Sequence, residues 1–216
     1  MCAPPWHLGE STDRPPTLRK QLMSDELEFE RCDEWGRSLS RIWIGALWGL
    51  AESTIFFLVP DIILTASALY SPRRSFGQLV AVLIGALLGG ALLYTAADKY
   101  PDEAKTLILN VPFIKARLVD KAELQLQQHG LLAMFIGSFT GVPYKTYAVN
   151  APHHAPFELF MAASLPSRLG RFLASWGIAS LLGMAFRRQI EAAPAVALGL
   201  LIICWIGFYT YYWSMF

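Results

Sequence analysis

Apolar residues dominate the chain from position 42 onward, in runs that short polar turns separate. Residues 75–97 form an uncharged run, long enough for a bilayer crossing of about 20 residues. Residues 192–216 form a second run, rich in Trp and Tyr near its end, as is typical of a membrane interface. A third run, residues 168–186, opens with Arg168 and Arg171. This pattern predicts an all-α, polytopic membrane protein with about three transmembrane helices.

Two further apolar runs, residues 42–70 and 131–165, are interrupted by charge and proline. The interrupting residues are Glu52, Pro60, Asp61, Pro143 and Lys145. An ionised group at bilayer depth costs roughly 3 kcal/mol, and proline leaves a carbonyl that hydrocarbon cannot satisfy. Paired broken segments of this kind indicate the central site of a transporter. Because each limb is short, we expect two re-entrant helical hairpins, near 42–70 and 131–165, with helix breaks at Pro60 and Pro143. One long kinked span is the alternative for the first.

The segment between these runs, residues 98–128, is polar and amphipathic, with an interruption at Pro112. Its charges alternate in sign around an apolar stripe, which predicts an interfacial helix. His129 and Gly130 follow, and we expect Gly130 to end the helix in the left-handed region.

The charge content divides the chain into parts. Charged residues make up 16% of the sequence, against about 25% in soluble domains. The polar residues concentrate before position 41. We therefore expect a partly disordered cytosolic arm (1–40), a membrane core (41–190) and a C-terminal transmembrane helix (191–216).

Arginine clusters near the apolar runs predict the orientation. Arg31, Arg37 and Arg41 precede the first run, Arg73 and Arg74 follow it, and Arg187 and Arg188 join the last two. All three clusters lie on one side if both broken segments are re-entrant, which makes the N-terminus cytoplasmic. The basic residues of 115–121 would then lie outside, which counts against this orientation.

Several classes of function lack support in the sequence. The net charge of +1 gives no nucleic-acid footprint. The nucleophile-elbow, Walker and zincin motifs are missing, so no catalytic residue or cofactor is expected. Cys2, Cys32 and Cys204 have no metal-ligand spacing, and the adjacent His153 and His154 form a poor metal site. We therefore expect no metal and no enzyme activity.

Three motifs resemble one membrane-protein family. The run Ala51-Glu52-Ser53-Thr54 to Val59-Pro60-Asp61 is similar to the acidic, proline-centred first segment of DedA-type proteins. The run Phe139 to Lys145 resembles the Thr-Pro-Ile-Pro-Tyr-Lys motif of the YqaA branch, and Arg168 with Arg171 resembles the family's paired arginines. On these motifs the chain is identified as a member of the VTT-domain (SNARE-associated) family, over roughly residues 44–186.

The resemblance implies two re-entrant hairpins that meet near mid-bilayer and a role in moving lipids between leaflets, in some bacterial members coupled to protons. It implies an inner-membrane location. The chain also departs from the family pattern: a single proline precedes Asp61, Gly141 replaces a proline, and Asn150-Ala151-Pro152 replaces a small-residue turn.

The chemistry of the charged residues fits a phosphate headgroup. Lys145, Arg168 and Arg171 are the candidate headgroup ligands, since arginine binds phosphate through two parallel N–H donors. Glu52 and Asp61 can neutralise these cations in the empty site or carry a proton. The sequence thus predicts a transporter or scramblase-like protein for a lipid-linked phosphate or phospholipid, with membrane lipids as its partners.

Structural roles remain open for the same residues. Glu52 and Lys145 could form a static ion pair between the hairpins, and the two arginines could reach headgroups from a helix end. The alternative function is a non-transporting membrane scaffold. Gly85 and Gly89 form a Gly-x-x-x-Gly face that allows helix association or a homodimer.

Overall fold

A computed structural model describes residue 40 and residues 42–56, 59–112 and 114–215 of the 216-residue chain. The described residues form helices, turns and short irregular stretches, without any strand, which confirms the predicted all-α class. The predicted arm lies almost entirely outside the described residues. Residues 44–216 form one compact unit, which is the subject below.

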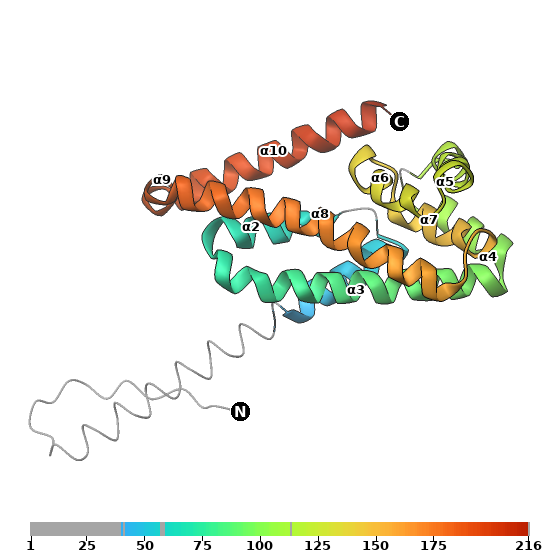
Figure 1. The fold of residues 1–216 in the computed structure, drawn as a ribbon. Helices are drawn as coiled ribbons and strands as arrows, with labels where there is room; N and C mark the ends of the chain where they lie inside the picture. Colours follow the sequence, from blue (N-terminus) through green and yellow to red (C-terminus); the bar gives the residue numbers. More distant parts are fainter. Residues whose placement is uncertain (1–39, 41, 57–58, 113, 216) are drawn as a thin grey trace, which may run out of the picture. The chain divides into compact units, whose positions relative to one another are not determined.

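The unit is an assembly of long and short helices (Figure 1). In chain order the elements are helical residues 44–54, α2 (Asp61–Tyr70), α3 (Pro72–Lys99), α4 (Pro101–Leu109), α5 (Ala116–His129), α6 (Leu132–Thr140), α7 (Tyr144–Asn150), η1 (Ala151–His153), α8 (Phe157–Ala185), α9 (Arg187–Ala192) and α10 (Pro194–Met215).

The first broken segment folds back on itself along α3. Its first limb, residues 44–54, runs alongside α3 in the same direction. Gly45 of the limb lies against Gln78 of α3, and Leu50 of the limb lies against Gly89 of α3. Helix α2 then returns to the start of α3, and its Leu64 packs in an apolar cluster with Leu79 and Val82 of α3. The chain therefore reverses between the two limbs, near Pro60, and returns to the end from which it came.

Small residues allow this close packing. A Cβ at Gly85 of α3 would overlap the carbonyl of Ala46, and one at Gly49 would overlap the carbonyl of Val82. The predicted Gly85–Gly89 face thus associates with a helix of its own chain, as small-residue faces allow.

Helix α8 corrects the predicted boundary near residue 166. The prediction separated a limb ending at 165 from a span beginning at 168, but α8 runs through Pro166 as one helix of 29 residues. Pro166 is exposed. At a rise of 1.5 Å per residue, Arg168 lies roughly 17 Å from the start of α8. Arg168 and Arg171 are therefore in the middle of a helix, not at its opening.

The second broken segment is shorter than predicted, because residues 157–165 belong to α8. Helix α6 ends at Gly141, which has the left-handed φ of 83°, and α7 begins after Pro143. Gly137 of α6 lies against Tyr147 of α7, so these two limbs also fold back on each other. The predicted break at Pro143 is thus a turn between two helices.

The amphipathic region forms α4 and α5, which are interrupted around Pro112 as predicted. The apolar stripe Leu118, Ala122 and Leu126 is buried in the core of the unit rather than presented outward. Helix α5 ends at His129, and Gly130 has φ 56° with ψ −147°. The φ is positive as expected, but the ψ lies outside the left-handed helical region that we predicted.

Two of the described helices, Pro72–Lys99 and the stretch Pro194–Tyr211 of α10, have the length and apolar composition needed to cross a membrane. The α10 stretch has none of its residues buried, whereas α3 is about half buried (56%). Large apolar side chains are also exposed on α6 and α8, among them Leu132, Phe139 and Leu181. Such extensive apolar exposure is unusual for a soluble monomer and typical of an interaction or membrane surface.

Candidate functional site

A buried ion pair joins the first broken segment to α8. Arg168 has no exposed surface and donates through Nη2 to Oε2 of Glu52, which is itself 4% exposed. The same Nη2 lies 3.2 Å from Oγ of Ser53. The guanidinium carbon lies 4.2 Å from the centroid of the Tyr144 ring, a cation–π distance. Glu52 therefore pairs with Arg168, and the predicted pair with Lys145 is not formed among the described residues.

The remaining donors of Arg168 are not satisfied. Nε and Nη1 are buried, and no described residue accepts a hydrogen bond from them. Each buried donor without a partner costs roughly 1–3 kcal/mol.

A second ion pair lies one helical turn further along α8. Nη2 of Arg171 lies 2.9 Å from Oδ2 of Asp61, which is 1% exposed and begins α2 directly after Pro60. A carboxylate in the first turn of a helix is favoured by the helix dipole. The turn at Pro60 thus fixes an acid where it can hold Arg171.

Lys145 connects the two broken segments directly. Its Nζ donates to the carbonyl oxygen of Phe56 at 2.6 Å, and the side chain is 2% exposed. Phe56 belongs to the irregular stretch that follows the first limb. The tips of the two segments therefore meet through a lysine and a backbone carbonyl.

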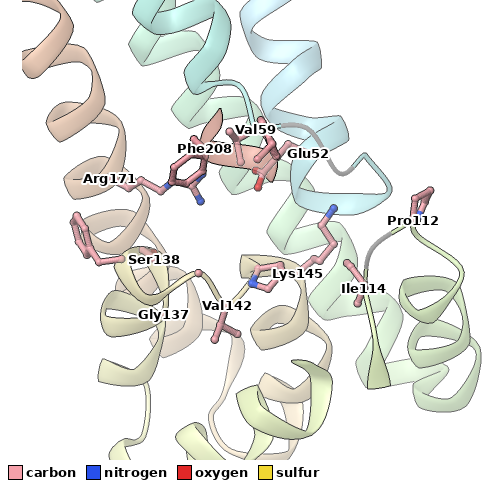
Figure 2. A pocket seen from close by; sticks show the side chains of 14 residues that line it. Glu52, Val59, Pro112, Ile114, Gly137, Ser138, Val142, Lys145, Arg171 and Phe208 are labelled. Carbon is pink, nitrogen blue, oxygen red and sulfur yellow. The ribbon is translucent and has the colours of Figure 1, made fainter. Parts of the chain in front are cut away.

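Three of the charged side chains face one cavity of about 170 Å³. Glu52, Lys145 and Arg171 reach toward this space from three different elements (Figure 2). A cavity needs roughly 10–15 Å³ to hold one water, so this cavity has room for a polar group with several waters. Its charged wall carries two cations and one anion. The uncharged lining includes Val59, Pro112, Ile114, Gly137, Ser138, Phe139, Gly141, Val142, Pro143, Phe208 and Tyr209.

The five predicted site residues divide into two layers around this cavity. Glu52, Lys145 and Arg171 line it, whereas Arg168 and Asp61 do not. Arg168 forms an ion pair with Glu52 on the side away from the cavity, and Asp61 forms an ion pair with Arg171. Arg168, which the sequence analysis made a candidate headgroup ligand, therefore does not line this cavity.

Two polar residues of the wall were missed by the sequence analysis. Ser138 lies in an apolar limb, and its Oγ is 2.8 Å from Oγ of Ser167. Tyr209 of α10 accepts a hydrogen bond from the backbone N–H of Val59 at 2.9 Å. The sequence assigned the aromatic end of the last run to a membrane interface, and no local signal distinguishes Tyr209 from its neighbours.

The histidines have ordinary structural surroundings. Nε2 of His154 lies 2.9 Å from Oε1 of Glu123 on α5, and η1 ends at His153. Among the residues that the structure describes, no group of three or more His, Cys, Asp or Glu side chains could hold a metal ion.

Comparison with known proteins identifies a bacterial relative but no family. No family model matches the chain, and no solved structure matches it. An uncharacterized protein of Haemophilus influenzae is 23% identical over 155 residues, which cover 69% of this chain and 80% of the relative. The chain is thus similar to a bacterial protein over most of both lengths.

Proposed function

We propose that the protein is an integral membrane protein that moves a lipid-linked phosphate or phospholipid headgroup between leaflets. The observation that carries the proposal is the cavity between the tips of the two broken segments, with Lys145 and Arg171 in its wall. A phosphate crossing a bilayer needs cations at depth and a protein-lined space for its charge. Lys145 supplies a mobile point charge and Arg171 a fixed pair of N–H donors.

Glu52 gives the site a second function in this proposal. It lies in the same wall as the two cations and is paired with Arg168. A carboxylate beside bound phosphate is repelled by it, so uptake of a proton by Glu52 accompanies headgroup entry. Loss of that proton then favours headgroup release, which couples transport to a proton gradient.

The broken segments support a re-entrant arrangement in a membrane, which we propose to be the bacterial inner membrane. Each segment folds back on itself, and helices α3 and α10 have the dimensions of membrane spans. Irregular backbone at membrane depth is tolerated where it lines a cavity, as residues 141–143 do here. We place the chain in the DedA/VTT-domain family on this arrangement and on its motifs. Gly141 differs from the family's proline, and its φ of 83° is one that proline cannot adopt.

A second candidate function, a non-transporting membrane scaffold, is favoured by one specific observation. Both acids already have arginine partners in the structure, so the pairs Glu52–Arg168 and Asp61–Arg171 can join helices without moving any ligand. Buried ion pairs of this kind contribute little net stability but specify which elements meet.

Leaflet exchange in proteoliposomes separates the two functions. The full chain is reconstituted with a phospholipid and, separately, a polyprenyl phosphate, each carrying a fluorophore that a membrane-impermeant reductant bleaches. We expect Lys145→Gln and Glu52→Gln to slow exchange by at least roughly tenfold, since a charge-assisted contact is worth about 1.5–3 kcal/mol.

Lys99→Gln is the matched control, because Lys99 is an exposed lysine at the end of α3. It removes the same charge and should leave exchange unchanged. Wild-type protein that moves neither lipid under a pH gradient, although folded, would contradict transport and favour the scaffold.

A further inference from the structure

Among the described residues, five charged side chains line the central cavity or pair with a residue that lines it, and their charges do not balance. Lys145, Arg168 and Arg171 carry three positive charges against two negative charges on Glu52 and Asp61, which leaves an excess of +1. Four of the five are exposed by 4% or less, and Arg171 is partly buried. Because a charge that has lost its water is costly unless it is paired, this excess favours an anionic ligand.

The unbalanced charge is that of Lys145. Glu52 pairs with Arg168 and Asp61 pairs with Arg171, so each acid already has an arginine partner. Nζ of Lys145 donates to the backbone carbonyl of Phe56 at 2.6 Å, and none of the ion pairs between described residues includes this lysine. A carbonyl oxygen accepts one hydrogen bond but cancels no charge, and an ammonium group has three donors. Two of those donors therefore remain for a ligand.

Glu52 cannot compensate Lys145 without giving up Arg168. If its carboxylate turned to the lysine, Arg168 would keep its full burial and lose its acid, while its Nε and Nη1 already have no described acceptor. Such a rearrangement moves the excess charge from one side chain to another. A proton on Glu52 would raise the excess from +1 to +2. The cluster is thus positive in both protonation states of Glu52.

This positive excess distinguishes between classes of phosphate headgroup. A headgroup whose only charge is its phosphate brings the counter-charge that Lys145 lacks. A zwitterionic headgroup brings an ammonium together with the phosphate, close to the cations Lys145 and Arg171 of the same wall (Figure 2). Like charges repel strongly where water is excluded. Glu52 would attract the ammonium only in competition with Arg168.

The apolar part of the wall favours a lipid over a free anion. Phe139 of α6 and Phe208 of α10 line the cavity, and they are 56% and 54% exposed. Both side chains therefore lie between the cavity and the apolar outer surface of the unit. A lipid can place its phosphate beside Lys145 while its hydrocarbon tail stays along this surface.

We propose that the central cavity selects its cargo by net charge, and that it takes an anionic phospholipid headgroup in preference to a zwitterionic one. The inference rests on the proposed function and names the class of lipid that the site moves. Phosphatidylglycerol represents the anionic class and phosphatidylcholine the zwitterionic class. The phosphate is common to both, so the net charge of the headgroup makes the difference.

The ratio of two exchange rates tests the proposal on the full chain. Proteoliposomes contain either lipid with the same fluorophore on an acyl chain, and leaflet exchange is measured without a membrane potential. We expect wild-type protein to exchange phosphatidylglycerol faster by at least roughly tenfold, since a charge-assisted contact is of that size. Because both rates are measured on one preparation, the ratio does not depend on the fraction of protein that is folded.

Two variants separate net charge from a specific lysine contact. Lys145→Gln removes the excess, so the ratio should fall to about one. Glu52→Gln combined with Lys145→Gln leaves Arg168 and Arg171 against Asp61, which restores an excess of +1 and should restore the preference for phosphatidylglycerol. A double variant whose ratio stays near one would overturn selection by net charge. Lys99→Gln, an exposed change at the end of α3, should keep the wild-type ratio.

The wild-type ratio alone can contradict the proposal, so the test does not depend on a variant that folds. Equal exchange of both lipids would overturn charge selection and leave the transport proposal standing, whereas exchange of neither lipid would contradict both. The vesicles also enclose radiolabelled glycerol 3-phosphate, which they should retain. Its release without exchange of phosphatidylglycerol would assign the cavity to a free anion and overturn the lipid headgroup.

Discussion

At the residue scale, the fully buried Arg168 lies against two aromatic rings, with its guanidinium carbon 4.2 Å from the centroid of Tyr144 and 5.5 Å from that of Phe172. Arg168 contacts Glu52, Ser53 and Tyr144, and it leaves two donors unmet. Removal of one partner from a buried pair costs about 3–5 kcal/mol, because the other charge stays buried alone. The energy of this pair is therefore measurable even though its net contribution is small.

We expect Arg168→Gln to lower the free energy of unfolding by about 3 kcal/mol, because Glu52 then loses its buried partner. The midpoint of thermal unfolding should fall accordingly. The double variant Glu52→Gln with Arg168→Gln should be more stable than the sum of the single changes predicts. Thermal unfolding in detergent measures both effects.

The pair Arg187–Glu191 provides the control, because it has the same chemistry in an exposed i, i+4 arrangement. Arg187→Gln should leave the unfolding midpoint unchanged. Additive effects in the Glu52 and Arg168 cycle would contradict the proposed coupling between these two side chains.

At the element scale, the stability of the first hairpin depends on glycines that let backbones touch. The first limb and α3 approach so closely at Gly85 that no side chain fits between them. Overpacking a tight interface costs typically 1–3 kcal/mol. A substitution at Gly85 therefore tests the packing of the first limb on α3 more directly than a substitution of an apolar side chain would.

Gly85→Ala should therefore lower the unfolding midpoint, since its Cβ would overlap the carbonyl of Ala46. Gly77→Ala is the matched control on the same helix, because its Cβ would meet nothing within 4 Å. Alanine favours a helix over glycine by about 1 kcal/mol, so this control should be neutral or more stable. Similar midpoints for both variants would mean that the first limb does not pack on α3 as described.

At the scale of the whole molecule, the position of α10 relative to the bilayer is a direct test of whether the protein spans a membrane. Its apolar stretch is unburied, and Cys204 on it is a free exposed thiol. Cys204 lies roughly 15 Å from the start of α10, near the middle of a hydrocarbon core of about 30 Å.

In membrane vesicles of a Cys2→Ser, Cys32→Ser protein, we expect Cys204 to resist a membrane-impermeant maleimide until detergent is added. The measurement is labelling followed by a mass shift. Arg188→Cys in a protein that also carries Cys204→Ser is the control and should label in inverted vesicles without detergent, because this exposed position lies on α9, at the face expected to be cytoplasmic. Rapid labelling of Cys204 in intact vesicles would contradict a transmembrane α10.

The long apolar runs were predictable from the sequence because hydrophobicity is a local property. The run at 75–97 became α3, and the run at 192–216 became α10, with boundaries that moved by three residues or fewer. The prediction failed at Pro166, where a proline usually ends or kinks a helix. There the helix continues through an exposed proline, which no local pattern in the sequence indicated.

The sequence by itself determined the helical class, the apolar spans, the two breaks and the identity of the charged residues within them, because these depend on composition and local backbone chemistry. Only the tertiary structure decided which charges pair, which of them face a cavity, and that Tyr209 from the far end of the chain completes its wall. These are contacts between residues distant in sequence, and no local pattern encodes the distance between two side chains that meet only after the helices pack.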